Sequence, residues 1–361
     1  MALPGTLLSV FPPPQFLASP AGGVDISSGS VKCVLLGGFG RGITLRTYAE
    51  TPLPEGVIVD GDIEQPDKLT EVLRSFRLRY GIHYAHASLP EKKAYLYKVL
   101  VAENANLRAG VEFDFETHVP LPPGEAVFDY EKVRKLESGT VVAVTAYAKR
   151  IVNQYQKVFA DAGIALRSLE VESQALARAA ISESDRSRVV MMMDFGRKTT
   201  RIAVVEYGVV VFTATLDIGG DTLTTAVMKL LNVPEPEAEE IKNNRGFLMS
   251  NENKNLVEAL MTTVSVVKDE VVKHLTYWNN PPADDLPRKP IEKVIICGGN
   301  ANLRGFPEYL EGTINIPVSV ASVWAHAFSL DEYIPPMQFS ESQEYATAVG
   351  LAIRGAGNKI W

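Results

Sequence analysis

Two turns of similar composition follow apolar strands, and each begins with an aspartate. The first is Gly23-Val-Asp-Ile-Ser-Ser-Gly-Ser-Val-Lys32, and the second is Met193-Asp-Phe-Gly-Arg-Lys-Thr-Thr-Arg201. Such turns expose backbone N–H groups and hydroxyls that can surround a phosphate, and their aspartates can hold a hydrated magnesium ion. Either turn alone is more often a plain hairpin. Because the arrangement occurs twice, we expect the two aspartates to face each other across a cleft and share one metal-bound triphosphate.

Two glycine pairs add a possible nucleoside site. Gly298 and Gly299 directly follow a buried strand pattern, where the absence of a Cβ lets a flat ring or a ribose lie against the backbone. Gly219 and Gly220 precede a predicted helix, with Asp221 as its expected N-cap. A glycine pair alone is more often a turn than a site.

The elements that must position these residues alternate along the chain. Strand-like apolar runs at 31–36, 189–194 and 294–297 are interspersed with helical patterns at 69–79 and 255–278. This alternation predicts layered α/β domains. The segment 85–163 differs, with short strands around a loop rich in proline and glycine, and reads as a small inserted α+β unit.

The composition of the chain argues against some classes of function. A chain of 361 residues suits two lobes, and a net charge of -7 gives no general attraction for nucleic acid. Cys33 and Cys297 lie in apolar runs and are expected to be small buried residues, and the five histidines show no zinc-ligand spacing.

The sequence also bears on location. No apolar stretch approaches the roughly 20 residues needed to cross a bilayer, and the first basic residue is Lys32, so a cytoplasmic protein is expected. The tail at 1–21 is apolar and interrupted by three consecutive prolines, which prevent one continuous helix. We favour a tail packed on the body over an arm that touches a membrane or a partner.

Taken together, the order of the motifs resembles the actin and sugar-kinase superfamily. Within it the chain is similar first to the PilM family and second to the FtsA family. The motifs that carry the likeness are Gly23-Val-Asp-Ile-Ser, Asp194-Phe-Gly and Cys297-Gly-Gly-Asn-Ala. The resemblance implies an α/β, actin-like ATPase fold of two lobes with mixed sheets flanked by helices and a 1C insertion in the first lobe. The implied divisions are an N-terminal tail (1–21), subdomain 1A (22–84 and 164–188), 1C (85–163), 2A (189–234 and 291–338), 2B (235–290) and a C-terminal helix returning to 1A (339–361).

The resemblance also implies roles for single residues. ATP and Mg²⁺ would occupy the cleft, with Asp25 and Asp194 on the metal and Glu172 orienting water. The residues that would bind the nucleotide are Ser27, Ser28, Gly29, Ser30, Lys32, Gly196, Lys198, Thr199, Gly219, Gly220, Glu239, Lys242, Gly298, Gly299 and Asn300.

The implied partner is the N-terminal peptide of a PilN-like inner-membrane protein, docked near 1A and 1C, with pilus assembly ATPases as possible further partners. The protein would then associate peripherally with the inner face of the membrane. Three alternatives stay open: an FtsA-like division protein, a sugar kinase on the same fold, and a peptide-binding protein without nucleotide. Ser27, Phe195 and Asn300 depart from the family pattern, which favours nucleotide binding over efficient hydrolysis.

Overall fold

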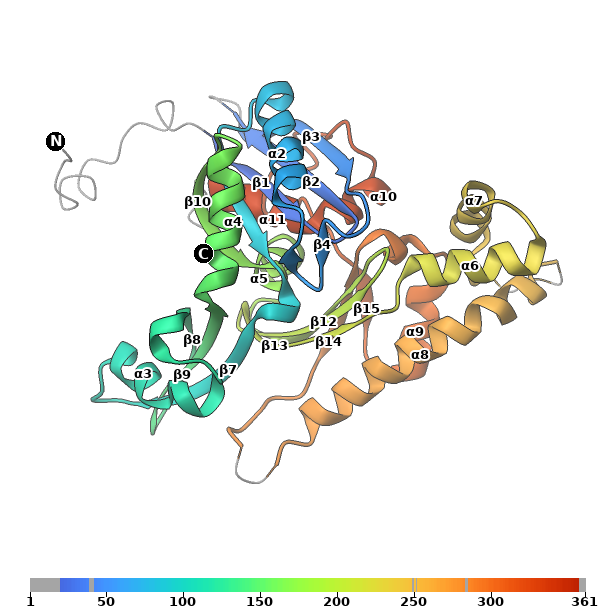
Figure 1. Cartoon of the computed structure of the whole chain (residues 1–361). Coiled ribbons are helices and arrows are strands. Elements are labelled where there is room, and N and C mark those ends of the chain that lie inside the picture. Colours follow the sequence, from blue (N-terminus) through green and yellow to red (C-terminus); the bar gives the residue numbers. More distant parts are fainter. Residues whose placement is uncertain (1–19, 39–41, 249, 251, 283–284, 357–361) are drawn as a thin grey trace.

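The computed structural model describes residues 20–38, 42–248, 250, 252–282 and 285–356, which form two lobes (Figure 1). The predicted tail at 1–21 therefore lies almost wholly outside the described residues. The first lobe contains a five-stranded sheet in the order β10-β6-β1-β2-β3. Its strands are β1 (Gly22–Ile26), β2 (Ser30–Gly37), β3 (Thr44–Pro52), β6 (Tyr84–Leu89) and β10 (Ala165–Val171), and β4 (Ile58–Val59) pairs with β5 (Asp62–Ile63) beside it.

Helices cover both faces of this sheet. On one face, α2 and α4 pack with Val24 and Val31 in one apolar core. On the other face, α5 and α11 pack with Val34 and Leu36. The bounds of the four helices are α2 (Pro66–Tyr80), α4 (Lys149–Asp161), α5 (Glu172–Ala180) and α11 (Ala346–Gly355).

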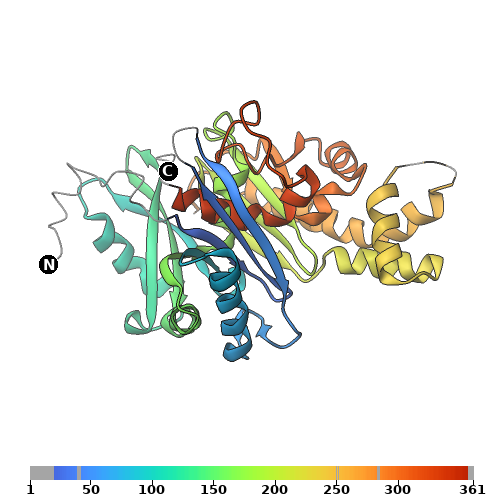
Figure 2. The same cartoon turned by 90° about the horizontal axis from the view of Figure 1, so that it is seen from above.

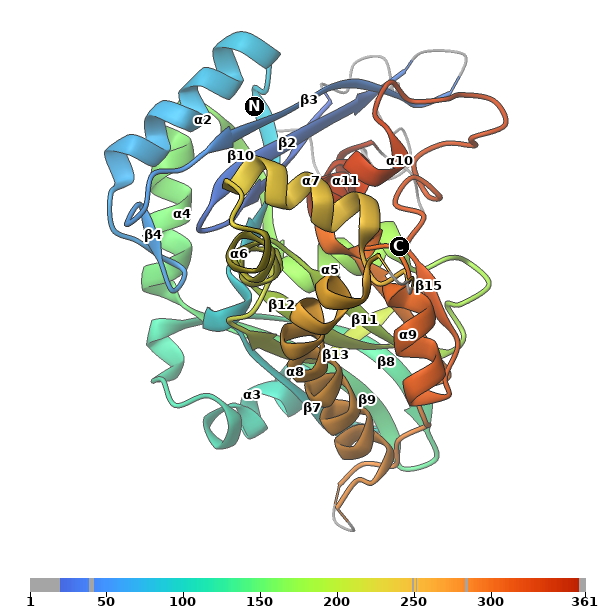
Figure 3. The same ribbon diagram turned by 90° about the vertical axis from the view of Figure 1, so that its right-hand side faces the viewer.

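The second lobe repeats this plan with a sheet in the order β13-β12-β11-β14-β15. Its strands are β11 (Val189–Phe195), β12 (Thr200–Glu206), β13 (Val209–Leu216), β14 (Lys293–Cys297) and β15 (Val318–Val320). Its helices are α6 (Gly220–Leu231), α7 (Glu235–Arg245), α8 (Lys254–Asn279) and α9 (Phe306–Ile314). The short α10 (Phe339–Ser342) contacts Gly299–Asn302 of this lobe and leads into α11 of the first. Figure 3 shows α8 in front of this sheet, with α6 above it and α7 higher still, level with α11 of the first lobe.

The continuous apolar run of β11 follows from burial on both faces. Val189, Met191 and Met193 pack under α8, whereas Val190 and Met192 point to α5 and α11 between the lobes. Each lobe thus shares one layer of helices with the other.

The two helices between the lobes touch closely. A Cβ built at Gly350 of α11 would lie 1.8 Å from the carbonyl oxygen of Ala175 of α5, so only glycine permits this approach. α11 also packs along β1, which carries the first predicted turn.

The insertion is smaller than the 85–163 expected from the sequence. β6 lies between β10 and β1 in the sheet of the first lobe, and α4 packs into the core of that lobe. What remains is a three-stranded sheet in the order β7-β9-β8 with one helix across it. Its elements are β7 (Tyr95–Ala102), α3 (Leu107–His118), β8 (Ala126–Leu136) and β9 (Gly139–Ala148). The insertion and α7 lie at opposite ends of the molecule (Figure 2).

The cysteines lie where the sequence predicted, buried and unpaired in the core. Burial raises the pKa of the Cys33 thiol to about 12, so it behaves as a small apolar residue. Within the described residues, no helix has both the length and the apolar content that crossing a bilayer requires.

Candidate functional site

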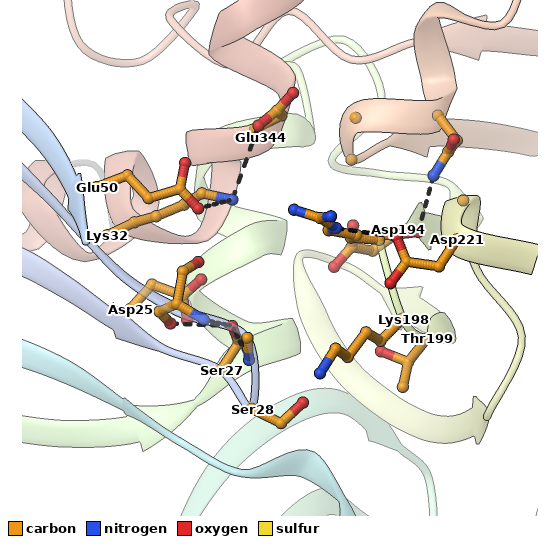
Figure 4. A pocket seen from close by; sticks show the side chains of 18 of the residues that line it. Asp25, Ser27, Ser28, Lys32, Glu50, Asp194, Lys198, Thr199, Asp221 and Glu344 are labelled. Carbon is orange, nitrogen blue, oxygen red and sulfur yellow. Dashed lines mark hydrogen bonds and ion pairs between the residues drawn. The ribbon is translucent and has the colours of Figure 1, made fainter. Parts of the chain in front are cut away.

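A cavity of about 490 Å³ opens between the two lobes, and both predicted aspartates line it (Figure 4). The two carboxylates come from the carboxyl-terminal ends of β1 and β11, the equivalent strands of the two sheets. Of the other predicted site residues, those that also line the cavity are Ser27, Ser28, Gly29, Ser30, Lys32, Gly196, Lys198, Thr199, Gly220, Glu239, Lys242, Gly298, Gly299 and Asn300.

The β1–β2 turn is held by its own hydroxyls. Ser27 Oγ donates to the carbonyl of Ser30 at 2.9 Å and accepts from the backbone N–H of Ser30 at 3.1 Å. Behind the turn, Ser88 Oγ donates to Asp25 Oδ1 at 2.8 Å, which fixes that carboxylate at the cavity wall. A Cβ built at Gly29 would lie 3.8 Å from Lys198 Cε, so the two turns face each other across the cavity.

Asn300 holds the β11–β12 turn in place through its side chain. Its side-chain amide donates to the carbonyl of Phe195 at 3.2 Å and to that of Gly196 at 2.8 Å. Gly298 must be glycine, because its φ is +85° and a Cβ there would lie 2.4 Å from Asp194 Oδ1. The Gly298–Asn300 segment therefore supports the second aspartate as well as lining the cavity.

Two predicted residues near this turn differ from expectation. Gly219 does not line the cavity; it is the N-cap of α6, where a Cβ would lie 2.4 Å from the carbonyl oxygen of Arg197. Asp221 is consequently not the N-cap; it lies in the first turn of α6 and accepts from Arg197 Nε at 2.9 Å. Arg197 also pairs with Glu235 at 3.1 Å, so its charge is already balanced by carboxylates.

Lysine side chains reach the cavity from three directions. Lys198 extends from the second turn toward Ser28 (Figure 4). Lys32 lies 3.5 Å from Glu50 and 3.9 Å from Glu344. On the α7 side, the buried Lys242 donates to Thr224 Oγ1 at 3.1 Å, and burial lowers its pKa. These cations and the exposed turn amides are donors suited to a polyphosphate.

Arg201 also lines the cavity, although the sequence did not predict it as a site residue. Its Nε and Nη2 atoms lie 3.1 Å and 2.9 Å from Asp194 Oδ2, and its Nη1 pairs with Glu172 Oε2. The available signal was the strand register: Lys32 lies opposite Asp25, and Arg201 lies opposite Asp194. Glu172 itself does not line the main cavity but a small hollow behind Arg201.

Burial governs the charges of this cluster. It raises the pKa of Glu172 to about 7, although Arg201 acts in the opposite direction. Burial likewise raises the pKa of Asp25, opposed by Arg201, Ser88 and Lys32. For Arg201, burial opposes the charged form, but Glu172 and Asp194 together raise its pKa well above the usual value.

The residues fit a phosphate chain better than a protein-bound metal ion. Asp194 Oδ2 is taken by Arg201, and Asp194 Oδ1 is pressed against Gly298. Among the described residues, no three His, Cys, Asp or Glu side chains form a group that could hold a metal. Magnesium at Asp25 stays a prediction, whereas coordination by Asp194 does not fit this arrangement.

A second hollow of about 330 Å³ lies where the first lobe, the insertion and the second lobe meet. Its walls include β8, β10 and β13, each of which is the edge strand of its sheet. Asp129 and Glu131 of β8 add carboxylates, and Arg354, which pairs with Glu170 of β10, adds a cation. We call this hollow the three-edge groove.

Comparison with known proteins supports one family over nearly the whole chain. A model of the family described as type IV pilus assembly protein PilM matches residues 23–356. Among solved structures, the PilM–PilN type IV pilus biogenesis complex superposes with a TM-score of 0.74 at 22% identity, covering 94% of this chain and 99% of that one.

More distant structures share the fold. MreB5 of Spiroplasma citri bound to ADP has a TM-score of 0.56 at 15% identity, covering 93% of this chain and 95% of that one. EutJ from Carboxydothermus hydrogenoformans has a TM-score of 0.54 at 19% identity, covering 95% and 90%. The predicted actin-like fold is confirmed.

Curated relatives match only in part. FtsA of Streptococcus pneumoniae is 23% identical over 51% of this chain and 45% of its own length. FtsA of Pseudomonas aeruginosa is 30% identical over 28% and 24%. The chain thus spans less than half the length of these division proteins. Because the pilus family model covers both lobes and the insertion, the chain belongs to the PilM family of type IV pilus assembly proteins.

Proposed function

We propose that this chain is an ATP-binding scaffold of a type IV pilus machine, held at the inner face of the membrane by a PilN-like partner. One observation carries the nucleotide part of the proposal. Asp25 and Asp194, from equivalent strands of separate lobes, line a single cavity together with backbone amides and three lysines. A triphosphate bound there would contact both lobes at once and set the angle between them.

The nucleoside would lie toward α7. Glu239, Lys242 and Asn243 line that end of the cavity, and Gly298 and Gly299 offer a flat backbone surface. The MreB5 structure, which shares this fold, is described as bound to ADP, which supports an adenine nucleotide. The magnesium ion and the water-orienting role of Glu172 remain predictions from the family resemblance.

A substitution at Gly29 tests the nucleotide site. Gly29→Glu should reduce affinity for a fluorescent ATP analogue at least about tenfold, because a carboxylate would enter the space between the turns and repel phosphates. The fold should tolerate the side chain, since the nearest atom to the added Cβ is Lys198 Cε at 3.8 Å. Gly312→Glu is the control, because it adds the same charge at an exposed position with no atom within 4 Å. Equal affinities in both variants would contradict the site.

For the partner, we propose that an extended peptide docks in the three-edge groove. Edge strands carry unpaired N–H and C=O groups, which an added strand can pair with. The carboxylates of Asp129 and Glu131 favour a peptide that includes a basic residue. The PilM–PilN complex, the structure that matches with a TM-score of 0.74, supports a partner of this kind.

Neighbouring residues of α5 contact the cleft and the groove. Glu172, in the first turn of α5, pairs with Arg201 of the cleft. Two residues later, Gln174 donates to Glu131 of β8 in the groove. A change in the lobe angle at the cleft would therefore move the walls of the groove.

The peptide proposal is tested with a labelled peptide that copies the N-terminus of the PilN-like protein from the same organism. Glu131→Arg should weaken its binding about tenfold or more, because the charge of the groove wall is reversed. Glu116→Arg on the exposed face of α3 is the matched control. If both variants bind as tightly as the wild type, the peptide docks elsewhere.

A further inference from the structure

Three buried carboxylates from three different elements lie within electrostatic reach of Arg201. Asp25 is 9%, Glu172 6% and Asp194 8% exposed. Their elements are β1, the first turn of α5 and β11, so the cluster draws on both lobes. Carboxylates removed from water in this way repel each other and require a counter-charge.

Arg201 is the cation in direct contact with two of these carboxylates. It uses one edge of its guanidinium on Asp194 and a further nitrogen on Glu172. Lys32, the equivalent residue of the first hairpin, instead faces Glu50 and Glu344. A guanidinium stays charged at all physiological pH values and presents its donors in a fixed plane, which suits two carboxylates at once.

The contact also joins the lobes. Arg201 lies on β12 of the second lobe, and Glu172 lies on α5, which packs on the first lobe through α11. A metal ion held by both aspartates would have to take over the oxygen of Asp194 that Arg201 now binds.

We propose that Arg201 is the resident counter-charge of this cluster and takes the place of a divalent metal ion, so that the nucleotide-free protein binds no such ion in the cleft. Its positive charge pairs directly with Asp194 and Glu172, and the contact with Glu172 holds the lobes together. The inference concerns the cleft proposed for nucleotide, but its test uses metal ions alone. Failure of nucleotide binding would therefore leave it standing.

The test titrates Mn²⁺ into the full-length protein without nucleotide and follows binding by electron paramagnetic resonance. Wild type should bind no Mn²⁺ in the cleft. Its Mn²⁺ binding should therefore equal that of Asp25→Asn. Arg201→Gln should bind one Mn²⁺ at least about tenfold more tightly, because the released carboxylates are then free to coordinate it. Asp25→Asn added to this variant should abolish the gain.

Thermal unfolding gives a second readout. Arg201→Gln should lower the midpoint by about 5 °C or more in chelator, because buried carboxylates lose their partner, and millimolar Mg²⁺ should recover part of the loss. Wild type should not respond to Mg²⁺. Arg197→Gln is the matched control, since this arginine of the same turn is 69% exposed in its side chain and should leave both readouts unchanged.

If Arg201→Gln alone does not fold, Arg201→Gln combined with Glu172→Gln replaces it and is compared with Glu172→Gln. The double variant should bind Mn²⁺ about tenfold more tightly, because Asp25 and Asp194 then lack the guanidinium. Wild type that binds Mn²⁺ in the cleft, or variants that gain no affinity, would overturn the proposal.

Discussion

At the scale of single residues, buried ion pairs join parts of the chain that are distant in sequence. Glu206 of β12 is fully buried and pairs with two cations of the insertion, Arg134 at 2.6 Å and Lys98 at 3.9 Å. These contacts fasten the insertion to the second lobe. They lie away from the nucleotide cleft, so their effect on stability can be measured separately.

We predict that Glu206→Gln lowers the free energy of unfolding by about 3 kcal/mol, because two desolvated cations lose their partner. Chemical unfolding measures this change. Glu183→Gln removes a carboxylate from the exposed pair with Arg186 and should change stability by less than about 1 kcal/mol. Equal losses in the two variants would argue against the buried pair.

A second residue-scale prediction concerns pH. Burial, followed by the charge of Arg354, lowers the pKa of His86 from 6.5 to about 4, and its ring bonds Ser168 Oγ at 2.7 Å. The other charged groups facing it are Glu170, Arg178 and Arg167.

Because the folded-state pKa is lower than the unfolded one, the stabilising contribution is present above pH 6.5 and is lost as the pH falls toward 4. His86→Gln should therefore remove about 2 kcal/mol of the acid-induced loss of stability, after allowance for partial exposure. Unfolding curves of both proteins across this pH range are the check. Identical pH dependence would show that His86 does not titrate in this way.

At the scale of elements, the fold depends on how closely α5 and α11 approach between the sheets. Gly350→Ala should destabilise the protein by about 2 kcal/mol or more, because the added Cβ would lie 1.8 Å from the Ala175 carbonyl oxygen. Gly312→Ala in α9 meets no atom within 4 Å and should stabilise by up to about 1 kcal/mol through helix propensity. Thermal unfolding of the pair distinguishes packing from a general effect of alanine.

At the scale of the whole molecule, the first turn of α5 connects the two sites, because Glu172 pairs with Arg201 of the cleft and Gln174 lines the three-edge groove. Saturating ATP analogue should change the affinity for the PilN-like peptide by about fivefold or more, and by linkage the peptide should change nucleotide affinity by the same factor. Fluorescence anisotropy measures both directions. Gln174→Ala, which removes the contact with Glu131, should reduce the coupling while leaving nucleotide affinity unchanged. Peptide affinity that ignores nucleotide would exclude this coupling.

The sequence by itself determined the local parts of the site. Strand, aspartate and turn are neighbours in the chain, so the composition of 23–32 and 193–201 predicted both hairpins. The apolar run 189–194 predicted a buried strand. That Gly298 and Gly299 admit a flat ring or a ribose stays a prediction. The family resemblance, which rests on the order of these motifs, was confirmed over 23–356.

Only the tertiary structure decided which charges meet. Arg201 and Glu172 are distant in sequence and come together because β12 and α5 pack across the lobe boundary. The same holds for β6, which pairs with β1 in the first lobe although its sequence adjoins the insertion. Local patterns specify strands and turns, but pairing between distant segments depends on the packing of the complete core, which no single stretch of sequence contains.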